Sequence, residues 1–364
     1  MDKVNLFPDK NFWNGKNVFI TGHSGFKGGW LSLWLSQLGA NVTGYSLEPN
    51  TDPSFYNECD IGSVTNSIFG NILDYKKLES SIINAKPEII IHMAAQALVL
   101  ESYRNPLDTY KTNIIGTLNI LEIIRNKSYV KAFINVTSDK CYENIEKQYS
   151  YKETDRMGGH DPYSSSKGCS ELVTSAYRLS FFNENSDSFI TSIASARSGN
   201  VVGGGDWSAD RLIPDFFKAV SQKKAMHIRH PSATRPWQHV LEPIRGYLIL
   251  AELMFKNEGY NEAWNFGPNN KDTSTVKNVL EELALQWNED VDISYSKDEP
   301  KQHEANLLNL DISKTISKLN WHPLFTIKNT IAFTCEWYRN FYLKDNNMQI
   351  YTLDQIKKYE SLLK

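Results

Sequence analysis

Two residues in the middle of the chain have the types and the spacing that proton transfer from a hydroxyl group requires. Tyr163 and Lys167 lie four residues apart in the run Tyr-Ser-Ser-Ser-Lys, so on a helix they share one face. A lysine beside a phenol favours the phenolate and lowers the pKa of the tyrosine. A tyrosine tuned in this way can act as a general base. Because the same spacing occurs by chance on solvated helix faces, the pair gains meaning only from other motifs.

A second group of reactive residues is the run Ser138-Asp139-Lys140, which follows a predicted strand at 131–137. A hydroxyl, a carboxyl and an amine stand here side by side, so the run offers a hydrogen-bond donor, an acid and a base to one substrate. Those roles require Asp139 to hold a proton and Lys140 to be neutral. The alternative is a surface ion pair between Asp139 and Lys140, a common arrangement that contributes little.

A glycine-rich turn near the start of the chain could bind a phosphate group. It follows the apolar run 18–20 and precedes residues 30–38, whose apolar side chains recur at helical spacing. A strand, a glycine turn and a helix in this order present free backbone N–H groups to a pyrophosphate. An ordinary glycine-rich β–α turn is the alternative. The residues that we expect at the cofactor are Gly22, His23, Gly25, Phe26, Lys27 and Gly28.

The elements that must position these groups alternate between apolar strands and amphipathic helices. We predict strands at 17–21, 41–46, 64–69, 88–93, 131–137 and 189–195, and helices at 27–38, 74–84, 108–125 and 163–182. Such alternation predicts an α/β fold with a doubly wound, Rossmann-like parallel sheet. Each motif comes directly after a predicted strand, at the edge where such sheets bind ligands.

The pattern is less regular after about residue 200, where we predict a smaller, mixed lobe. Glycine, proline, tryptophan and arginine cluster between Gly203 and Pro243, and later helices are expected at 242–256, 274–287 and 326–343. We therefore expect a cofactor-binding domain over 1–199. Residues 200–364 should form mainly the substrate-binding lobe, with some segments returning to the first domain.

Composition excludes several other classes of function. The net charge is −3 and the isoelectric point about 6.3, which gives no electrostatic basis for binding nucleic acid or an anionic membrane. No apolar run approaches the roughly 20 residues of a membrane span, and the polar start of the chain does not have the pattern of a signal peptide. The four cysteines and eight histidines lack metal-ligand spacing, so we expect no metal site and a reducing, cytoplasmic setting.

Taken together, these motifs resemble those of the extended short-chain dehydrogenase/reductase family. The glycines are spaced Gly-x-x-Gly-x-x-Gly, and Tyr163 and Lys167 match the family's catalytic pair. Within the family, Ser138-Asp139 resembles the hydroxyl–Asp–Glu pattern of the sugar-nucleotide 4,6-dehydratases, with Lys140 in the place of the glutamate. That lysine, together with the turn Gly-His-Ser-Gly-Phe-Lys-Gly-Gly-Trp, is similar to the branch that acts on CDP-glucose.

The resemblance implies NAD as the cofactor. The acid that normally holds the ribose is replaced by Ser46, and Glu48 is the nearest acid. No Lys or Arg occurs between Asn41 and Asp60, so a 2′-phosphate would lack a partner and NAD is favoured over NADP. The family pattern places further residues at the cofactor: Asn71 and Ile72 at the adenine, Ala94 and Ala95 against the backbone of the ligand, and Asn113 as a structural asparagine. Asn71 could instead be a helix N-cap.

The resemblance also implies a lyase reaction in three steps at one site. Tyr163 takes the 4′-hydroxyl proton while hydride passes from C4′ to NAD. Lys140 removes the C5′ proton and Asp139 protonates the departing 6′-hydroxyl, so water is lost. Hydride then returns to C6′, giving CDP-4-dehydro-6-deoxy-D-glucose and regenerating NAD. Such a product feeds dideoxyhexoses of bacterial surface polysaccharide, including O-antigen lipopolysaccharide.

Substrate-binding residues are expected in the second half of the chain. Asn200 matches the family asparagine at the sugar-nucleotide phosphates, and Arg235 matches an arginine that grips the diphosphate. Arg211 is a weaker expectation, with an exposed charge at a helix start as the alternative. The segment 218–228 is expected to hold the nucleotide base. Among the tryptophans, Trp207 is the best placed to contact the sugar.

Three alternatives remain open at this point. A nucleotide-sugar 4-epimerase uses the same tyrosine and lysine but needs no adjacent acid and base, so the Ser138–Lys140 run argues against it. A non-enzymatic, dinucleotide-sensing protein would be expected to lose Tyr163 or Lys167. A dehydratase acting on a dTDP- or GDP-sugar is separable only by testing substrates. We also expect a homo-oligomer, a dimer or a tetramer, formed through the helices at 108–125 and 163–182.

Overall fold

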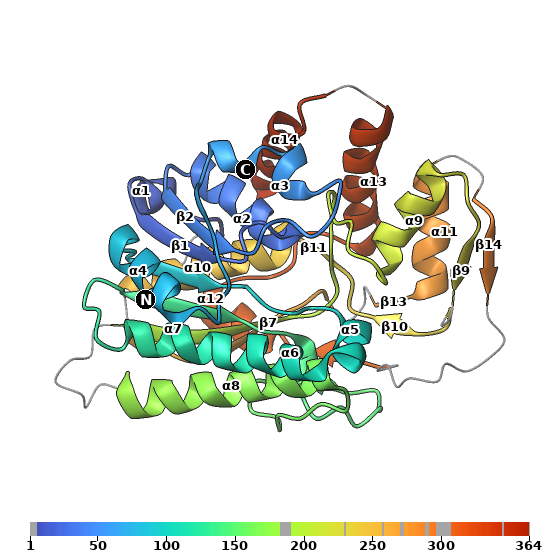
Figure 1. Ribbon diagram of the computed structural model, residues 1–364. Helices are drawn as coiled ribbons and strands as arrows, with labels where there is room; N and C mark the ends of the chain where they lie inside the picture. Colours follow the sequence, from blue (N-terminus) through green and yellow to red (C-terminus); the bar gives the residue numbers. More distant parts are fainter. Residues whose placement is uncertain are drawn as a thin grey trace.

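A parallel sheet of seven strands forms the centre of the molecule (Figure 1). The computed structural model describes residues 6–182, 191–228, 231–256, 258–269, 273–287, 291–295, 307–343 and 346–363. The strand order is β12-β7-β5-β4-β1-β2-β3, and every neighbouring pair is parallel. The strands are β1 (Asn17–Thr21), β2 (Asn41–Ser46), β3 (Asn66–Phe69), β4 (Ile89–His92), β5 (Ala132–Val136), β7 (Ser192–Ser198) and β12 (Ala263–Phe266).

Helices cover both faces of this sheet (Figure 1). On one face α2 packs on β1 and β2, while α10 packs on β5, β7 and β12. On the other face α4 packs on β1 and β2, α8 packs on β7, and α7 lies between α4 and α8. These helices are α2 (Phe26–Gln37), α4 (Tyr75–Ala85), α7 (Gly116–Ile124), α8 (Pro162–Phe181) and α10 (Leu241–Lys256).

The central strands form because their side chains are apolar on both sides. In β1, Val18 and Ile20 enter the hydrophobic core under α2 and α10, whereas Phe19 enters the core under α4 and α7. This alternation follows from the two-residue period of a strand. A strand that is buried on both faces needs a nearly continuous apolar sequence, and β4 shows it in the run Ile89-Ile90-Ile91.

Further elements extend the first half and build the lobe on the right of Figure 1. The other helices are α1 (Lys10–Trp13), α3 (Phe55–Glu58), α5 (Val99–Arg104), α6 (Pro106–Tyr110), α9 (Leu212–Ser221), α11 (Val276–Trp287), α12 (Ser313–Leu319), α13 (Ile327–Leu343) and α14 (Met348–Glu360). The short strands are β6 (Ser150–Tyr151), β8 (Val201–Val202), β9 (Met226–Ile228), β10 (Thr234–Arg235), β11 (Gln238–His239), β13 (Ser274–Thr275), β14 (Ile293–Tyr295) and β15 (Asn309–Leu310).

The predicted fold class is confirmed, and two of the predicted elements need correction. The expected helix over 108–125 is confirmed as helical, but it contains a π-helical turn, Lys111–Ile115, between α6 and α7. Asn113 lies in this turn, and its side chain bonds to the backbone of Gln96 and to Ser166. The predicted strand at 189–195 is β7, shifted toward Ser198; residues 189 and 190 lie outside the described part of the chain.

α14 was not predicted, and the reason lies in its buried face. The buried side chains are Met348, Thr352, Gln355, Ile356 and Tyr359, so polar residues interrupt the apolar period. Two of those polar side chains have partners in the folded chain, since Thr352 accepts from Trp337 Nε1 at 2.8 Å and the Gln355 amide nitrogen donates to the carbonyl of Phe333 at 2.9 Å. Tertiary partners therefore replace the apolar contacts that the pattern lacks.

The order of the strands determines where a ligand can enter. β1 has β2 on one side and β4 on the other, so the chain reverses its direction of winding at β1. In doubly wound sheets a crevice opens at this point, outside the carboxyl ends of the strands. The glycine-rich turn follows β1 directly and therefore lies at that crevice.

Candidate active site

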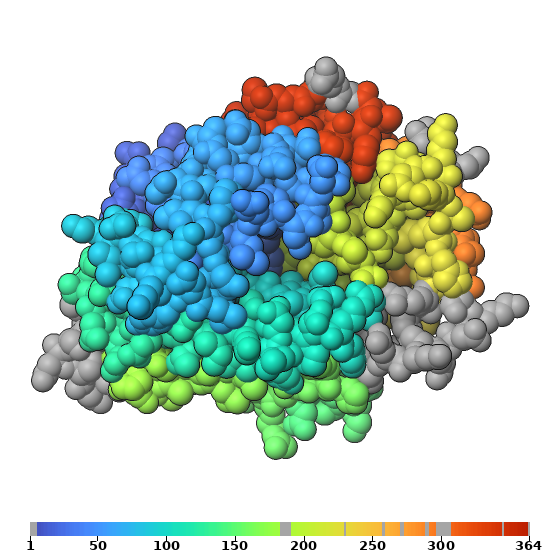
Figure 2. All heavy atoms as spheres, viewed as in Figure 1, coloured from blue at the N-terminus to red at the C-terminus, as the bar shows by residue number. Residues whose placement is uncertain are grey.

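A cavity of about 1150 Å³ lies at the carboxyl edge of the sheet, between the first half of the chain and the smaller lobe. Figure 2 shows the surface hollowed between the blue-to-teal first half and the yellow lobe. Most of the residues predicted for the site line this cavity: Gly22, Gly25, Phe26, Lys27, Gly28, Ser46, Asn71, Ile72, Ala94, Ala95, Ser138, Asp139, Lys140, Tyr163, Lys167, Asn200, Arg211 and Arg235.

The side chains of two predicted cofactor residues lie outside the cavity wall. His23 is fully buried under Gly44, with its ring nitrogens 3.0 Å from the hydroxyls of Ser46 and Ser67. Burial lowers the pKa of His23 to about 4, so the imidazole is neutral. Asn113 instead holds the backbone of Gln96 and the helix α8. Both side chains therefore support the cavity from behind.

The glycine-rich turn is as tight as the motif predicts. Gly22 has φ +83°, and a Cβ there would lie 2.9 Å from the backbone nitrogen of Ala94. A Cβ on Gly28 would lie 2.1 Å from the carbonyl oxygen of Gly22. Any residue other than glycine at position 28 would therefore push the first turn of α2 away from Gly22. Gly25 is different, because a Cβ there would meet only that same carbonyl, at 3.4 Å. Its missing side chain leaves open space in front of the helix start.

The far end of the cavity has the features of an adenosine site. Ser46 and Glu48 both line it, and the Ser46 hydroxyl is already bonded to Ser24 Oγ and His23. Glu48 is thus the acid beside Ser46 at this wall, and it can replace the acid that is missing from the usual ribose position. The N-cap alternative for Asn71 is wrong, because Asp74 caps α4 while Asn71 Oδ1 accepts from the N–H of Leu73.

Tyr163 and Lys167 share one face of α8 and both line the opposite end of the cavity. Asp161 caps this helix by accepting from the N–H of Ser164, and Pro162 occupies its first turn. Burial lowers the pKa of Lys167 to about 8, against the charge of Glu171, which raises it. The Lys167 ammonium donates to the carbonyl of Val136 at 3.4 Å.

The expected lowering of the Tyr163 pKa by Lys167 is wrong. Burial raises the pKa of Tyr163 to about 12, outweighing a hydrogen bond with Ser138 and the charge of Arg211, which both lower it. The charge of Asp139 adds to the increase. The cation that counteracts the effect of burial on the pKa of Tyr163 is therefore Arg211, from the lobe, rather than Lys167.

The Ser138-Asp139-Lys140 run turns into the same end of the cavity through a short 3-10 turn after β5. Ser138 Oγ donates to Asp139 Oδ1 at 3.0 Å and accepts from the Lys140 N–H at 3.2 Å. Asp139 is 1% exposed, and its Oδ2 has no hydrogen-bond partner among the described residues. A buried, unpartnered carboxyl oxygen is costly, so this oxygen is available to a ligand. The side chains do not form the expected alternative, a surface ion pair.

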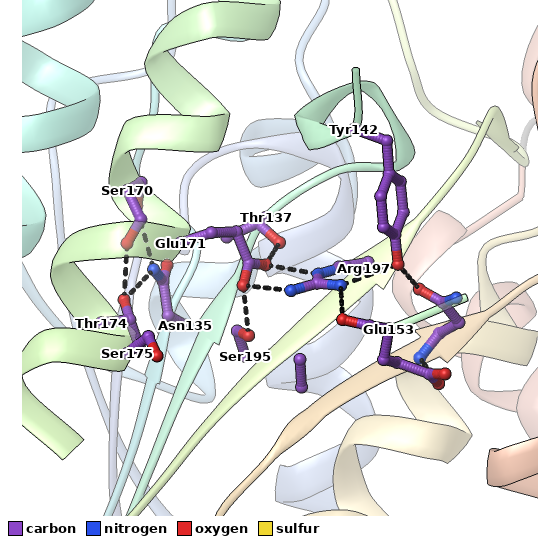
Figure 3. A network of polar contacts seen from close by, with 12 residues as sticks. Asn135, Thr137, Tyr142, Glu153, Ser170, Glu171, Thr174, Ser175, Ser195 and Arg197 are labelled. Atoms are coloured by element: carbon purple, nitrogen blue, oxygen red, sulfur yellow. Dashed lines mark hydrogen bonds and ion pairs between the residues drawn. The ribbon is translucent and has the colours of Figure 1, made fainter. Parts of the chain in front are cut away.

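A fully bonded ion pair supports the site from below (Figure 3). The two oxygens of Glu171, on α8, accept from Nε and Nη2 of Arg197, on β7, at 2.9 and 2.8 Å. Thr137 and Ser195 donate to the same carboxylate. Burial would raise the pKa of Glu171, but the charge and hydrogen bonds of Arg197 lower it below its usual value. The carboxylate is therefore ionised and fixes β5, β7 and α8 relative to one another.

The predicted substrate residues occupy the lobe side of the cavity. Arg211 occupies the N-cap position of α9 without a side-chain capping bond. Its Nη1 donates to Asp206 Oδ2 at 2.9 Å and its side chain lines the cavity, so it is not the plain exposed charge of the alternative interpretation. Arg235 is 7% exposed and lies on β10. The expectation for Trp207 is wrong, because it packs against Trp337, Tyr338 and Phe341. Trp237 lines the cavity instead.

Comparison with known proteins identifies the family. The model of the GDP-mannose 4,6-dehydratase family matches residues 19–334. The chain belongs to this family. It is 46% identical to the CDP-glucose 4,6-dehydratase of Salmonella typhimurium, over 97% of this chain and 98% of the relative. It is 26% identical to the dTDP-glucose 4,6-dehydratase of Haemophilus influenzae, over 88% of this chain and 97% of that protein.

Solved structures with the same fold include a dehydratase and an epimerase that act on nucleotide sugars. The dTDP-glucose 4,6-dehydratase of Bacillus anthracis, in complex with NAD, superposes with a TM-score of 0.73 and 22% identity, covering 90% of this chain and 97% of that one. The UDP-glucose 4-epimerase of Thermotoga maritima, with UDP-glucose, has a TM-score of 0.76 and 24% identity, covering 89% and 99%. At these identities the likeness shows the shared fold.

The Glu171–Arg197 pair leads to a prediction about stability. Glu171→Met or Arg197→Met leaves one buried charge unpaired, so each variant should lose about 3–5 kcal/mol of unfolding free energy. The double variant removes both charges and should lose clearly less than the sum. Chemical denaturation near neutral pH measures this. Because the pKa of Glu171 is depressed, the contribution is complete above the usual glutamate pKa and disappears as pH falls through the folded-state pKa.

The exposed pair Lys357–Asp354, with N and O 2.9 Å apart and side chains about 60% exposed, provides a matched control. Its single variants should change stability by less than about 0.5 kcal/mol. If the double variant lost as much unfolding free energy as the two single variants of Glu171 and Arg197 together, the two charges would not be coupled.

Proposed function

We propose that this protein is a lyase that dehydrates CDP-D-glucose to CDP-4-dehydro-6-deoxy-D-glucose with NAD held at the described cavity. The observation that carries the dehydration is the unpartnered, buried Oδ2 of Asp139 beside Lys140, at the same cavity end as Tyr163. An epimerase needs the tyrosine but no such acid and base. The choice of CDP-glucose is supported by the 46% identity to the Salmonella enzyme over nearly the whole of both chains.

The residues of the cavity fit NAD. The glycine cradle at the start of α2 leaves backbone N–H groups facing open space, which suits a pyrophosphate. Glu48 would take the ribose hydroxyls, with Asn71 and Ile72 at the adenine and Ala94 and Ala95 along the ligand. NAD, when bound, would supply a hydride acceptor for C4′ and later a hydride donor for C6′.

The chain's own groups would carry the protons. Tyr163 would remove the 4′-hydroxyl proton, and Ser138 would hydrogen-bond to the same oxygen. Lys167 would hold the bound cofactor and sugar in position. For this step the pKa of Tyr163 must fall from about 12. The positive charge of the nicotinamide ring, when the cofactor is bound, would lower that pKa. Asp139 would protonate the leaving 6′-hydroxyl, and Lys140 would remove the C5′ proton and later return one.

The lobe would hold the nucleotide. We propose that residues 200–364 serve mainly this purpose, although α10 and β12 pack into the sheet of the first domain. Arg235 and Asn200 would bind the diphosphate, and Met226–Ile228 of β9 lines the cavity where the base would lie. The product would be an intermediate for the dideoxyhexoses of bacterial surface polysaccharide.

We place this activity in the cytoplasm, where NAD and nucleotide sugars are available and where the four unpaired cysteines stay reduced. No helix among the described residues is both long and apolar enough to cross a membrane.

Incubation of the purified protein with CDP-, dTDP- and UDP-glucose separately tests the function. A 4-keto-6-deoxy sugar, detected by its ultraviolet absorption in alkali, should form from CDP-glucose. Asp139→Asn should lower its formation about 10²- to 10⁴-fold, as expected for the loss of a general acid. Lys140→Met should lower it similarly, while the exposed Lys76→Met should not. Epimerised sugar without ketosugar would contradict dehydration, and preference for another nucleotide would contradict CDP.

We also propose that the protein forms a homo-oligomer through α6, α7 and α8, which lie side by side on one flank (Figure 1). Two leucines on α8, Leu172 and Leu179, are 59% and 66% exposed, and seven residues apart they share a face. Leu107 and Ile115 add exposed apolar surface from the neighbouring segment. Exposed apolar side chains on neighbouring helices are typical of an interface.

Sedimentation velocity tests the interface. The wild type should sediment as a dimer or tetramer, and Leu172→Glu with Leu179→Glu should shift it toward monomer. Leu285→Glu, at a leucine of α11 that is 73% exposed, serves as the control and should leave the assembly unchanged. A wild type that is monomeric at working concentration would refute the proposal.

A further inference from the structure

Gly199 is a residue of the cavity wall to which the proposed proton transfers give no role. It lies between Ser198, the last residue of β7, and Asn200, and all three line the cavity. A Cβ on Gly199 would lie 2.8 Å from Asp139 Oδ2 and 2.7 Å from Pro236 Cγ. These distances are well below van der Waals separation, so the position has room for a hydrogen atom and not for a side chain.

Backbone conformation does not explain the glycine at this position. The φ angle of Gly199 lies outside the left-handed range, whereas Gly22 in the glycine-rich turn has φ +83°. An ordinary amino acid could therefore adopt the backbone φ of Gly199 without strain. What excludes a side chain here is the narrow space between the carboxyl group of Asp139 and the ring of Pro236.

The main chain around Gly199 is held on both sides. Ser198 is still part of the central sheet, where it is paired with Phe266 of β12. On the other side, the carbonyl of Asn200 accepts from the N–H of Gln238 at 3.0 Å, where β8 and β11 begin to pair. A β-carbon at position 199 could therefore not be accommodated by a small shift of the main chain.

The carboxyl group of Asp139 is the part of the site that would move instead. Its Oδ1 accepts from Ser138 Oγ at 3.0 Å, and its Oδ2 has no hydrogen-bond partner among the described residues. Rotation about the terminal bond of an aspartate side chain meets only a low barrier. A β-carbon at position 199 would therefore turn this carboxyl, displacing Oδ2 and disturbing the bond to Ser138.

We propose that Gly199 is a positioning residue for the loss of water: because it has no side chain, the Asp139 carboxyl keeps Oδ2 where the departing 6′-hydroxyl would take its proton. This inference rests on the proposed function, and it adds a residue that acts through Asp139 rather than on the sugar itself. It also explains why a glycine lies at a position whose backbone does not require one.

Only one step of the proposed reaction depends on the position of this carboxyl. When water is lost, the C5′–H bond breaks and its proton passes to Lys140, while its electron pair forms the C5′–C6′ double bond. The C6′–O bond breaks as the oxygen takes the proton of Asp139 and leaves as water. The earlier oxidation at C4′ passes a proton to Tyr163 and hydride to NAD, without the Asp139 proton. A turned carboxyl should therefore slow the loss of water and spare the oxidation.

Rapid mixing of the full chain and NAD with CDP-glucose separates the two steps. The ultraviolet absorption of reduced cofactor follows the oxidation at C4′, and quenched samples made alkaline measure the 4-keto-6-deoxy sugar. Gly199→Ala should form reduced cofactor as fast as the wild type. Its keto sugar should form about 10²-fold more slowly, the loss that a small misplacement of a catalytic group can cause. Reduced cofactor should therefore accumulate in this variant.

Two double variants test whether Gly199 acts through Asp139. In an Asp139→Asn background, Gly199→Ala should cause no further loss of keto sugar, because the carboxyl that it displaces is already absent. Pro236→Ala removes the ring carbon on the other side of the same narrow space. Added to Gly199→Ala, it should restore part of the keto sugar, because the β-carbon can then lean away from Asp139.

Gly267→Ala, directly after the neighbouring strand β12, is the matched control. A Cβ there would lie 3.4 Å from its nearest neighbour, Leu310 Cβ, and Gly267 lies outside the cavity wall, so both steps should proceed as in the wild type. Full formation of keto sugar by Gly199→Ala, or an equal loss of both steps with and without Pro236→Ala, would overturn the role of Gly199 and leave the proposed function standing. If the wild type formed neither reduced cofactor nor keto sugar, the proposed function would fail together with this inference.

Discussion

The shared direction of the seven strands is the constraint on which the rest of the structure depends. Because every strand ends at the same edge, residues that follow different strands meet there although they are distant in sequence. The glycine turn follows β1, the Ser138–Lys140 run follows β5, and Ser198 ends β7. Each of these segments lines one cavity. The chemistry of the site is therefore a consequence of the topology, and the helices mainly hold the strands in place.

Burial makes the charges at this edge unusually sensitive to one another. Glu171 and Arg197 satisfy each other completely and form a fixed support beneath α8. Lys167 lies above that support, and burial lowers its pKa to about 8. The positive ring of a bound cofactor would therefore act strongly on the charge of this lysine. Exposed charges, screened by water, would not respond in this way.

Much of the site could be predicted from local sequence. The spaced glycines all lie at the start of one helix, and Tyr163 and Lys167 lie on one face of another. Short-range sequence patterns therefore reveal both. Glu171 could have been found by the same rule, because it lies four residues after Lys167 on the same face. Arg197 occupies a buried strand position, where a charged residue demands a partner.

Other features depend on contacts that no local pattern contains. His23 turns away from the cavity because Gly44, on the neighbouring strand, leaves room for its ring. The pKa of Tyr163 rises because burial outweighs the charges around it, and the opposing cation comes from the lobe. Gly199 looks like an ordinary loop residue until its closeness to Asp139 and Pro236 is known. The polar face of α14 similarly acquires its partners only in the folded chain.

The central claim is that one site oxidises C4′ and reduces C6′ of the same sugar, with the cofactor regenerated in between. The most direct test uses CDP-glucose carrying deuterium at C4′, mixed with substrate labelled only with ¹³C, and mass spectrometry of the products. The account predicts that deuterium appears at C6′ of the molecules that lost it from C4′ and does not cross to the ¹³C-labelled molecules. Deuterium lost to water, or shared between the two populations, would contradict it.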